Sequence, residues 1–379
     1  MKKYRVAHIH NDKKFIRLGD ILLSPEFDNK TIFIGDKGDY AGMPNSDISL
    51  FEKDKMSVAK IVAACKEMDF VIFYSIDEIA TKIILALPKK VKIGWRFFGF
   101  ELYDKHREKY ISDSTKMVIN EGLKLNESYL SMIKGKFRFL LKAYKNQLFL
   151  KSISRCDVFF GLYQEEYLML KKVYPNLPHF IPVAMNIGYL ESKPMIEIQK
   201  EKYFLVGNSR NIWNNHFDIL EIVNRNTNGG NYKATLLVNY GHRGYYYKKL
   251  LEFAKSIVNV VLIEDYMTLD NFDELYIKCA ALVINSKRQL AVYNIRKALE
   301  HGGKVYLNED NSYYKYLKNN NFLVFNIQEF EADFSTGNLL LDKDSAQYNY
   351  NQLIALSNKN SVKIFRNNIL DFLKSPIKS

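Results

Sequence analysis

Short apolar runs alternate with stretches of helical periodicity along almost the whole chain. Runs of this length form buried strands, and the amphipathic stretches between them form helices that cover a sheet. The pattern therefore predicts an α/β fold with parallel sheets. The expected strands are Tyr4–Ile9, Thr31–Ile34, Phe70–Tyr74, Val91–Trp95, Asp157–Gly161 and His179–Pro182 in the first half, and Tyr203–Val206, Ala234–Val238, Val258–Ile263, Ala281–Asn285, Lys304–Leu307 and Phe322–Phe325 in the second.

The alternation is interrupted in Asn186–Lys202, where apolar residues follow neither the strand period nor the helix period for long. A chain of 379 residues also exceeds what one hydrophobic core usually serves. We therefore expect two Rossmann-like parallel-sheet domains that face each other across a cleft, an N-terminal one at 1–188 and a C-terminal one at 200–360. Residues 361–379 are expected to form a C-terminal helix that could pack back on the N-terminal domain.

Two open α/β sheets in tandem place the natural ligand site at the carboxyl ends of their strands. That geometry suits enzymes that use nucleotide sugars, and it also suits periplasmic-type binding proteins and some epimerases. Because one fold supports many activities, the function has to be argued from the residues at that edge.

The composition adds a strong positive charge. Lysine and arginine outnumber aspartate and glutamate by 55 to 42, which gives a net charge of +13. Such an excess predicts an anionic partner, and nucleic acid, phospholipid headgroups and a phosphorylated substrate all fit it.

Other features of the sequence bear on the compartment. Cys65, Cys156 and Cys279 are far apart and outside any C-x-x-C pattern, which argues against a disulfide framework or a zinc site and favours a reducing cytoplasm. We find neither a signal-peptide pattern nor an apolar stretch long enough to span a bilayer. We therefore expect a protein that is neither secreted by that route nor membrane-spanning.

The first candidate binding segment follows the expected strand Tyr203–Val206. Gly207 allows a ligand to approach the backbone closely, and Asn208 and Ser209 offer hydrogen-bond donors. His216 opens the next helix, whose free N–H groups and dipole favour an anion. An ordinary strand-to-helix turn capped by asparagine is the alternative.

The second candidate segment follows the expected strand Ala281–Asn285 and opens a helix that ends at a Gly-Gly pair. Arg288 could pair with a diphosphate through its planar guanidinium, and Ser286 adds a donor. Gln289 or Asn294 could hydrogen-bond sugar hydroxyls. The alternative is a solvated loop followed by a C-capped helix. If both loops bind, they lie on the same edge of one sheet.

Three residues of the first half could act as acids or bases. Glu101 follows an aromatic strand end, where desolvation would raise the pKa of its carboxyl toward use as a general base. His10 and Asp12 follow the first expected strand and could deprotonate a hydroxyl at its carboxyl end. All three have structural alternatives, because Glu101 could cap a helix or pair with nearby cations, and His10 and Asp12 could be turn residues.

A basic, aromatic-rich segment runs through Met132–Arg155 without an acidic residue. Such a helix suits an anionic membrane surface, where cations meet headgroups and apolar side chains enter the interface. The alternative is a domain helix with an apolar inner face and a solvated basic outer face. Its basic residues are Lys134, Lys136, Arg138, Lys142, Lys145, Lys151 and Arg155.

The sequence shows no metal-binding pattern. The histidines lack the spacing of H-E-x-x-H, and the one D-x-D match, Asp342–Asp344, lies in a polar stretch near the C-terminus instead of after a strand. We therefore expect chemistry that needs no metal ion.

Several segments, taken in order, resemble one known family. They are similar to segments of the 4-acetamido-4,6-dideoxygalactose transferases of enterobacterial common antigen synthesis, glycosyltransferase family 56. The resemblance covers about residues 90–325 and is most specific in V-G-N-S. The segments include Leu205-Val-Gly-Asn-Ser209 with Asn215-His216, the aromatic stretch Gly94-Trp-Arg-Phe-Phe-Gly-Phe-Glu-Leu-Tyr103, and Cys279-Ala-Ala-Leu-Val-Ile-Asn-Ser-Lys-Arg-Gln289.

This resemblance implies a GT-B glycosyltransferase without a cofactor, peripheral on the cytoplasmic face of the cell membrane. Its substrates would be a nucleoside-diphosphate sugar and a polyprenyl-diphosphate-linked glycan. The expected function is then transfer of a sugar, an amino or deoxy sugar among the candidates, to a lipid-linked or cell-surface glycan. The residues that the resemblance assigns to the donor are Gly207, Asn208, Ser209, His216, Arg288 and Gln289.

The chain departs from the family pattern at two places. Glu101 stands where the family has aspartate, and Leu290–Asn294 stands where it has a Gly-x-Gly-like stretch. Two other functions remain open on the residues alone. One is another sugar-nucleotide enzyme of this fold, such as an epimerase or a protein glycosyltransferase, and the other is a basic protein that binds nucleic acid or glycan.

Overall fold

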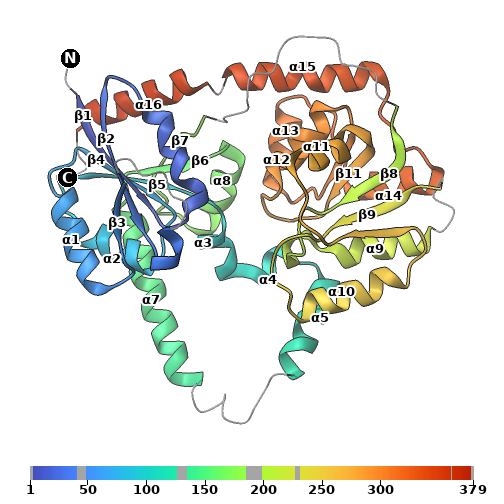
Figure 1. The fold of residues 1–379 in the computed structure, drawn as a ribbon, viewed down its shortest axis with the longest axis horizontal. Helices are drawn as coiled ribbons and strands as arrows, with labels where there is room; N and C mark the ends of the chain where they lie inside the picture. Colours follow the sequence, from blue (N-terminus) through green and yellow to red (C-terminus); the bar gives the residue numbers. More distant parts are fainter. Residues whose placement is uncertain are drawn as a thin grey trace. The chain divides into compact units, whose positions relative to one another are not determined.

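The computed structural model describes residues 3–40, 48–125, 135–184, 199–226, 231–359 and 361–376. The chain divides into two compact units, each with its own sheet (Figure 1). The N-terminal unit comprises Met1–Leu102, Tyr129–Asn186 and Lys359–Ser379, and the C-terminal unit comprises Tyr103–Ser128 and Ile187–Asn358.

The N-terminal unit contains a seven-stranded sheet in the order β3-β2-β1-β4-β5-β6-β7. All neighbouring strands are parallel, as the alternation of strands and helices predicts. The order reverses between β1 and β4, and ligands of open parallel sheets bind beyond the carboxyl ends at such a point. The strands are β1 (Tyr4–His10), β2 (Phe27–Ile34), β3 (Ile48–Phe51), β4 (Phe70–Tyr74), β5 (Lys92–Arg96), β6 (Val158–Gly161) and β7 (His179–Pro182).

Helices of the N-terminal unit begin where the sequence supplies caps. The Asp77 carboxylate, for example, accepts hydrogen bonds from the backbone N–H of Ile79 and Ala80 at 3.0 and 2.8 Å and so starts α2. The helices are η1 (Lys13–Leu22), η2 (Lys37–Tyr40), α1 (Lys55–Cys65), α2 (Glu78–Ala86), α3 (Phe100–Tyr103), α7 (Gly135–Arg155), α8 (Gln164–Val173) and α16 (Val362–Lys374).

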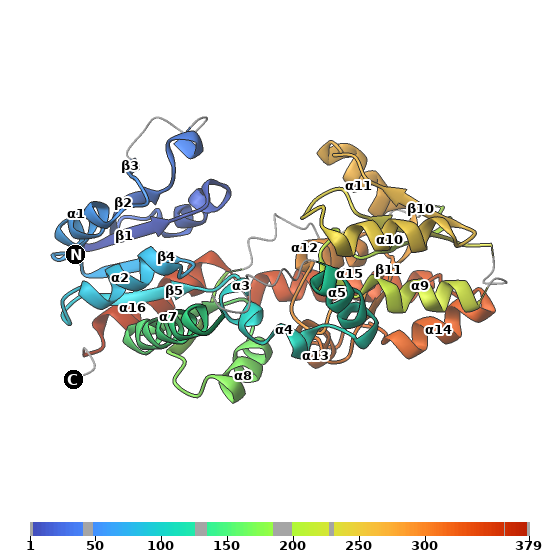
Figure 2. The same ribbon diagram turned by 90° about the horizontal axis from the view of Figure 1, so that it is seen from below.

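The last helix, α16, belongs to the N-terminal unit (Figure 2). Phe365, Ile369 and Leu373 on its inner face join the core that includes Phe70 of the central sheet. The buried Lys92 ammonium donates to the carbonyl oxygens of Phe372, Leu373 and Ser375 at 2.7, 3.1 and 2.6 Å. A cation at the carbonyls of the last turn offsets the negative end of the helix and fixes α16 in place.

The C-terminal unit contains a five-stranded parallel sheet in the order β10-β9-β8-β11-β12. Its order reverses between β8 and β11, so that both sheets are Rossmann-like. The predicted α/β class, with two parallel-sheet units, is confirmed. The strands are β8 (Glu201–Val206), β9 (Lys233–Leu237), β10 (Val260–Ile263), β11 (Cys279–Ile284) and β12 (Lys304–Leu307).

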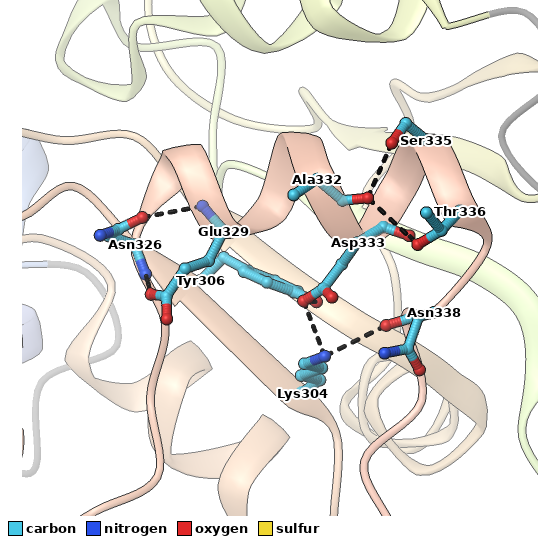
Figure 3. A network of polar contacts seen from close by, with 9 residues as sticks. All are labelled: Lys304, Tyr306, Asn326, Glu329, Ala332, Asp333, Ser335, Thr336 and Asn338. Atoms are coloured by element: carbon cyan, nitrogen blue, oxygen red, sulfur yellow. Dashed lines mark hydrogen bonds and ion pairs between the residues drawn. The ribbon is translucent and has the colours of Figure 1, made fainter.

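Helix α14 is fastened to this sheet by an apolar face and a polar contact. Phe330 and Phe334 pack in the core, while the Asp333 carboxylate lies 2.7 Å from the Lys304 ammonium on β12 (Figure 3). The Tyr306 hydroxyl donates to the same carboxylate at 2.8 Å. The other helices of the unit are η3 (Asp104–His106), α4 (Arg107–Tyr110), α5 (Asp113–Leu125), η4 (Ile212–Asn214), α9 (His216–Arg225), α10 (Tyr245–Lys255), α11 (Leu269–Lys278), α12 (Val292–Glu300), α13 (Ser312–Asn319), α14 (Ile327–Thr336) and α15 (Lys343–Lys359).

One segment of the first half packs with the C-terminal unit. The expected N-terminal domain was continuous over 1–188, whereas Tyr103–Ser128 belongs to the other unit. Helix α5 of this segment packs on α9 and α10. Val118 joins the C-terminal core, and a Cβ at Gly122 would lie 2.6 Å from the Tyr245 ring. Apolar contacts of α5 with these two helices therefore decide its place.

Two strand expectations differ from the structure. The expected strand Phe322–Phe325 forms only an isolated bridge between Phe325 and Tyr306. Its apolar residues are explained by packing, because Phe322 and Val324 are buried. Strand β3 was not expected, since its four residues at the edge of the sheet are too short and too exposed to give a periodic signal.

Among the described helices, none combines the length and the apolar character that crossing a bilayer requires. The three cysteines are buried and carry free thiols. Asp342 of the D-x-D match caps α15, because its carboxylate accepts from the Ser345 backbone N–H at 2.8 Å.

Candidate functional site

The C-terminal unit brings the two predicted binding segments together where its strand order reverses. The loop after β8 and the loop after β11 leave adjacent strands at their carboxyl ends. Asn215 of the first loop donates to the backbone carbonyl of Asn285 in the second at 2.8 Å. The Trp213 ring of the first loop lies 4.7 Å from the Arg288 guanidinium of the second. These loops therefore form one site, at the position where parallel sheets bind ligands.

Gly207 ends β8 in a conformation that other residues avoid. Its φ is +68°, and an added Cβ would lie 2.7 Å from the His216 Nε2 atom. His216 is fully buried at the start of α9, and its Nδ1 forms a hydrogen bond of 3.0 Å with the Tyr246 hydroxyl. Burial lowers the pKa of His216 to about 3. At neutral pH the ring is therefore uncharged and contributes shape, not charge, to the site.

The side chains of Asn208 and Ser209 are occupied within the protein. The Asn208 amide donates to the Tyr240 hydroxyl at 2.7 Å. The Ser209 hydroxyl donates to Asn208 Oδ1 at 3.4 Å and accepts from the Asn214 amide at 3.3 Å. These contacts fix the course of the loop.

Two helices begin at this site without side-chain caps. Helix α9 starts after Asn215 and helix α12 after Ala291, and both preceding residues have left-handed backbone conformations with φ of 47° and 58°. The N–H groups of a first helical turn have no partners within their own helix. In α9 the first N–H, that of His216, donates to the Tyr246 hydroxyl at 3.3 Å. The other N–H groups of this turn and those that begin α12 suit an anionic ligand.

Arg288 is buried between two aromatic rings. It is 7% exposed, and its guanidinium lies 4.7 Å from the Trp213 ring and 5.1 Å from the Tyr103 ring. Its Nη1 donates to the Gln289 backbone carbonyl at 3.3 Å, and the Ser286 hydroxyl donates to the Arg288 backbone carbonyl at 2.9 Å. Ser286 thus shapes the loop, and the neighbouring Gln289 is half-buried.

Asn294 lies in the first turn of α12 and is buried. Its amide donates to the Tyr276 hydroxyl at 2.5 Å. This contact uses one of the two amide N–H donors to hold α12 against α11, so that the second N–H and the carbonyl oxygen are left for the sugar contact expected from the sequence.

Arg210 was missed by the sequence analysis. Its side chain is 4% exposed and lies 4.7 Å from the Tyr247 ring. Within the described part of the chain, its Nε finds no hydrogen-bond partner, and no carboxylate lies within ion-pair distance. A buried cation without a counter-charge is unstable unless an anion completes its surroundings. Its place in the loop that begins at Gly207 was the signal that could have revealed it.

In the N-terminal unit, Glu101 has the environment that its aromatic neighbours predict. It is 5% exposed, and its carboxylate accepts hydrogen bonds from Trp95 Nε1 at 3.2 Å and from the Phe98 backbone N–H at 3.3 Å. Burial raises its pKa from 4.5 to about 7, although these hydrogen bonds oppose the shift. A carboxyl group with a pKa near neutrality can accept and release a proton at physiological pH.

The pH dependence of folding should report this raised pKa. Because the pKa of Glu101 is higher in the folded protein than in the unfolded chain, its contribution to stability is fully present below pH 4.5. This contribution is lost as the pH rises through about 7, where the buried carboxyl ionises. Glu101→Gln removes the loss, so the free energy of unfolding of the variant relative to the wild type should rise by about 3 kcal/mol between about pH 4.5 and pH 7.5. Urea denaturation across this range measures it. The exposed Glu108→Gln is the control, and parallel profiles for Glu101→Gln and wild type would contradict the assignment.

His10 and Asp12 have different environments. His10 is fully buried at the end of β1, stacked on Tyr74 at 3.9 Å, and neither ring nitrogen has a hydrogen-bond partner among the described residues. Burial lowers its pKa to about 3, so it is a neutral imidazole with free donor and acceptor positions. Asp12 caps η1 through the Lys14 backbone N–H at 3.1 Å and pairs with the Lys14 ammonium at 3.0 Å. Asp12 therefore has the role of a turn residue, which was the structural alternative to a role as a base.

Ser75 is a further residue of this edge that the sequence analysis missed. It follows β4 with a φ of 83°, which is costly for a residue other than glycine. Its hydroxyl donates to Asn11 Oδ1 at 2.8 Å, and the Asn11 amide donates to Asp77 at 3.2 Å. These contacts join the ends of β1 and β4 at the point where the strand order reverses.

The basic segment forms helix α7 over part of its length. Lys134 and the side chains of Lys136, Arg138 and Lys142 lie outside what the structure describes. Lys145 pairs with Glu78 of α2 at 2.7 Å, and Arg155 lies 3.5 Å from Asp157. Two of the charges that seemed uncompensated in the sequence therefore have partners elsewhere in the fold.

In the comparisons with known proteins, the chain is similar to solved structures only. No family model matches it, and no curated protein matches it. HepE from Anabaena, solved in complex with UDP and glucose, has a TM-score of 0.64 at 12% identity and covers 98% of this chain and 100% of its own. The N-terminal domain of Candida albicans trehalose-6-phosphate phosphatase has a TM-score of 0.65 at 10% identity, with coverages of 98% and 96%. The α,α-trehalose 6-phosphate synthase from Burkholderia multivorans has a TM-score of 0.57 at 9% identity, with coverages of 99% and 98%.

These likenesses extend over almost the whole of each chain, so they include both sheets. The chain therefore has the GT-B fold, in which two Rossmann-like domains follow each other in the sequence. At 9 and 12% identity the likeness establishes the fold, and the activity has to be argued from the site.

Proposed function

We propose that the chain is a glycosyltransferase that takes its sugar from a nucleoside diphosphate. The observation that carries this proposal is the pair of buried guanidinium groups, Arg210 and Arg288, on neighbouring loops of the C-terminal sheet edge. A diphosphate supplies the charge that Arg210 lacks, and guanidinium groups bind phosphate oxygens with two parallel hydrogen bonds. The uncapped starts of α9 and α12 add N–H donors beside them.

In the proposed reaction an acceptor hydroxyl oxygen bonds to the anomeric carbon while the bond from that carbon to the diphosphate oxygen breaks. The electron pair leaves with the nucleoside diphosphate, whose charge Arg210, Arg288 and the two helix starts stabilise without a metal ion. The hydroxyl proton passes to a base, and Glu101 is the best candidate because its pKa lies at about 7. His10 is too weakly basic, at its pKa of about 3, to serve as that base.

The acceptor and the sugar rest on the resemblance to glycosyltransferase family 56. We propose a polyprenyl-diphosphate-linked glycan as the acceptor, and an amino or deoxy sugar as a candidate for the transferred group. Support comes from the GT-B fold and from the match of Gly207, Asn208, Ser209 and His216 to the family pattern. The neighbour HepE, solved with UDP and glucose, makes UDP a reasonable first probe.

Nucleotide binding tests the proposal directly. Thermal unfolding with UDP, ADP, GDP and dTDP should show a rise in the midpoint with at least one of them, because a ligand that binds the folded state stabilises it. Release of that nucleoside diphosphate from its sugar conjugate should then depend on a polyprenyl-diphosphate-linked glycan. Release that does not depend on any acceptor would favour an epimerase or hydrolase. Binding of duplex DNA without nucleotide binding would favour a nucleic-acid-binding protein.

A lipid-linked acceptor requires the protein to reach a membrane, and we propose that α7 lies against the anionic cytoplasmic face. Tyr144 and Leu150 are apolar side chains exposed on this helix at 58% and 38%, and the exposed Lys151 follows them. Lys151→Glu should reduce partition to phosphatidylglycerol vesicles about 10-fold, since each cation near such a surface contributes about 1 kcal/mol. Lys171→Glu on α8 is the matched control. Equal partition of both variants and wild type in vesicle sedimentation would show that α7 does not contact the membrane.

A further inference from the structure

We infer that Tyr103 is a positioning residue of the nucleotide site, which it serves by holding the Arg288 guanidinium against Trp213. The inference rests on the proposed function and extends it to a residue of the first half of the chain. Tyr103 is fully buried and begins the segment that packs with the C-terminal unit. The three side chains form a stack, with the guanidinium 5.1 Å from the tyrosine ring and 4.7 Å from the tryptophan ring.

The stack fixes the orientation of the Arg288 guanidinium plane. A free arginine side chain has many rotamers, and binding a phosphate with both arms of the guanidinium selects few of them. Contacts between a guanidinium and aromatic faces fix its plane without neutralising its charge. The two rings therefore orient the Arg288 guanidinium and leave its positive charge in place for an anion.

Further contacts keep Tyr103 in place. Its ring meets the Tyr110 ring edge-on at 4.8 Å. The Ser112 backbone N–H donates to Asn215 Oδ1 at 2.8 Å, and the Asn215 amide donates to the Asn285 carbonyl at 2.8 Å. Asn215 is fully buried, so one side chain joins the segment to both nucleotide loops.

The same segment adds a positive charge to this region. The guanidinium of Arg107 lies 5.9 Å from the Trp213 ring. Trp213 thus has two guanidinium groups near it, one from the second loop and one from the segment that begins with Tyr103. Their mutual repulsion is tolerable where an anion binds, which agrees with a positioning role at a diphosphate site.

The alternative is that the stack only attaches the segment to the C-terminal unit. A purely structural Tyr103 would change stability and would change nucleotide affinity equally whether or not Arg288 is present. A positioning Tyr103 would affect affinity only through Arg288. A double-mutant cycle on nucleotide affinity separates the two.

The experiment uses the full chain and whichever of UDP, ADP, GDP and dTDP binds most tightly, with affinity measured by titration calorimetry. Tyr103→Leu should weaken binding about five-fold or more, and Tyr103→Phe should keep most of the affinity because its ring face remains. In an Arg288→Ala background, Tyr103→Leu should have no further effect. Tyr232→Leu, a buried tyrosine next to the amino end of β9, is the matched control for loss of packing and should leave affinity unchanged.

Should Tyr103→Leu fail to fold, the same cycle is run with Trp213→Phe, whose smaller ring weakens the other half of the stack. Equal losses of affinity with and without Arg288 would overturn the inference. Unchanged affinity in Tyr103→Leu, together with weaker binding in Arg288→Ala, would overturn it while leaving the proposed function intact. If the wild type binds none of the four nucleotides, both fall together.

Discussion

Arg210→Met is expected to weaken binding of a nucleoside diphosphate about 30-fold or more, because one charge-assisted hydrogen bond contributes about 2 kcal/mol. The same change should raise the free energy of unfolding of the free protein by about 1 kcal/mol or more, since it removes a buried charge that has no counter-charge. Arg210 is 4% exposed, and among the described residues its guanidinium has a cation–π contact with the Tyr247 ring and no ion pair. Methionine keeps the length of the aliphatic part and can remain packed on that ring.

The opposite signs of the two effects make this test specific. A protein that carries a charged residue to bind a ligand is commonly less stable, when the ligand is absent, than a variant with an apolar residue in that place. Titration calorimetry measures the affinity, and urea denaturation without nucleotide measures the stability. Arg225→Met is the control, because Arg225 is 62% exposed, pairs with Glu331 and lies on α9 at the end far from the site. Wild-type affinity in Arg210→Met would show that the diphosphate does not bind at the β8 loop.

The strands could largely be predicted from the sequence, for a physical reason. A strand of a parallel sheet that is covered on both faces is a continuous apolar run, and β4, β6 and β11 are buried along their whole length. Strand β3 lies at the edge and is only partly buried, so it carries no such signal. The stretch Phe322–Phe325 carries the signal without forming a strand, because burial alone produces an apolar run.

The place of α5 could not be predicted from its own sequence. An amphipathic helix shows which of its faces is buried, but not which unit it is buried against. The chain order suggested the N-terminal unit, whereas Gly122 fits closely against Tyr245 and Val118 joins the C-terminal core. Complementary shape between segments far apart in the sequence made this choice.

The candidate site was predictable where backbone rules govern it. A glycine at a strand end followed by a helix indicated the β8 loop, and the donor-rich turn after β11 indicated Arg288. Arg210 and Trp213 lie in the first of these loops, yet nothing in their spacing distinguishes them from surface residues. Their importance comes from burial, 4% exposure for each, which follows from how the loops fold over each other.

The second large effect is expected at the buried ion pair that fastens α14 to β12. Lys304 is 5% exposed, and its ammonium has the Asp333 carboxylate at 2.7 Å and the Asn338 carbonyl at 3.1 Å (Figure 3). Asp333→Ala leaves this ammonium buried without a counter-charge and also removes the acceptor of the Tyr306 hydroxyl. The free energy of unfolding should fall by about 3 to 5 kcal/mol, which is typical when one partner of a buried pair is lost.

A cycle of variants separates the cost of the unpaired charge from the worth of the pair. Lys304→Met alone should cost less than Asp333→Ala, because the Asp333 side chain is 21% exposed and water can reach its carboxylate. The double variant Lys304→Met, Asp333→Leu should regain most of the loss, since an apolar pair of similar volume replaces the ion pair at a net cost of about 1 kcal/mol or less. Urea denaturation measures all three. If the losses of Lys304→Met and Asp333→Ala simply add when these two changes are combined, the two side chains act independently, and Phe330 and Phe334 alone hold α14 on the sheet. Because the pair lies at the amino end of β12, away from the nucleotide loops at the carboxyl ends, nucleotide affinity should stay at the wild-type value in every variant that remains folded.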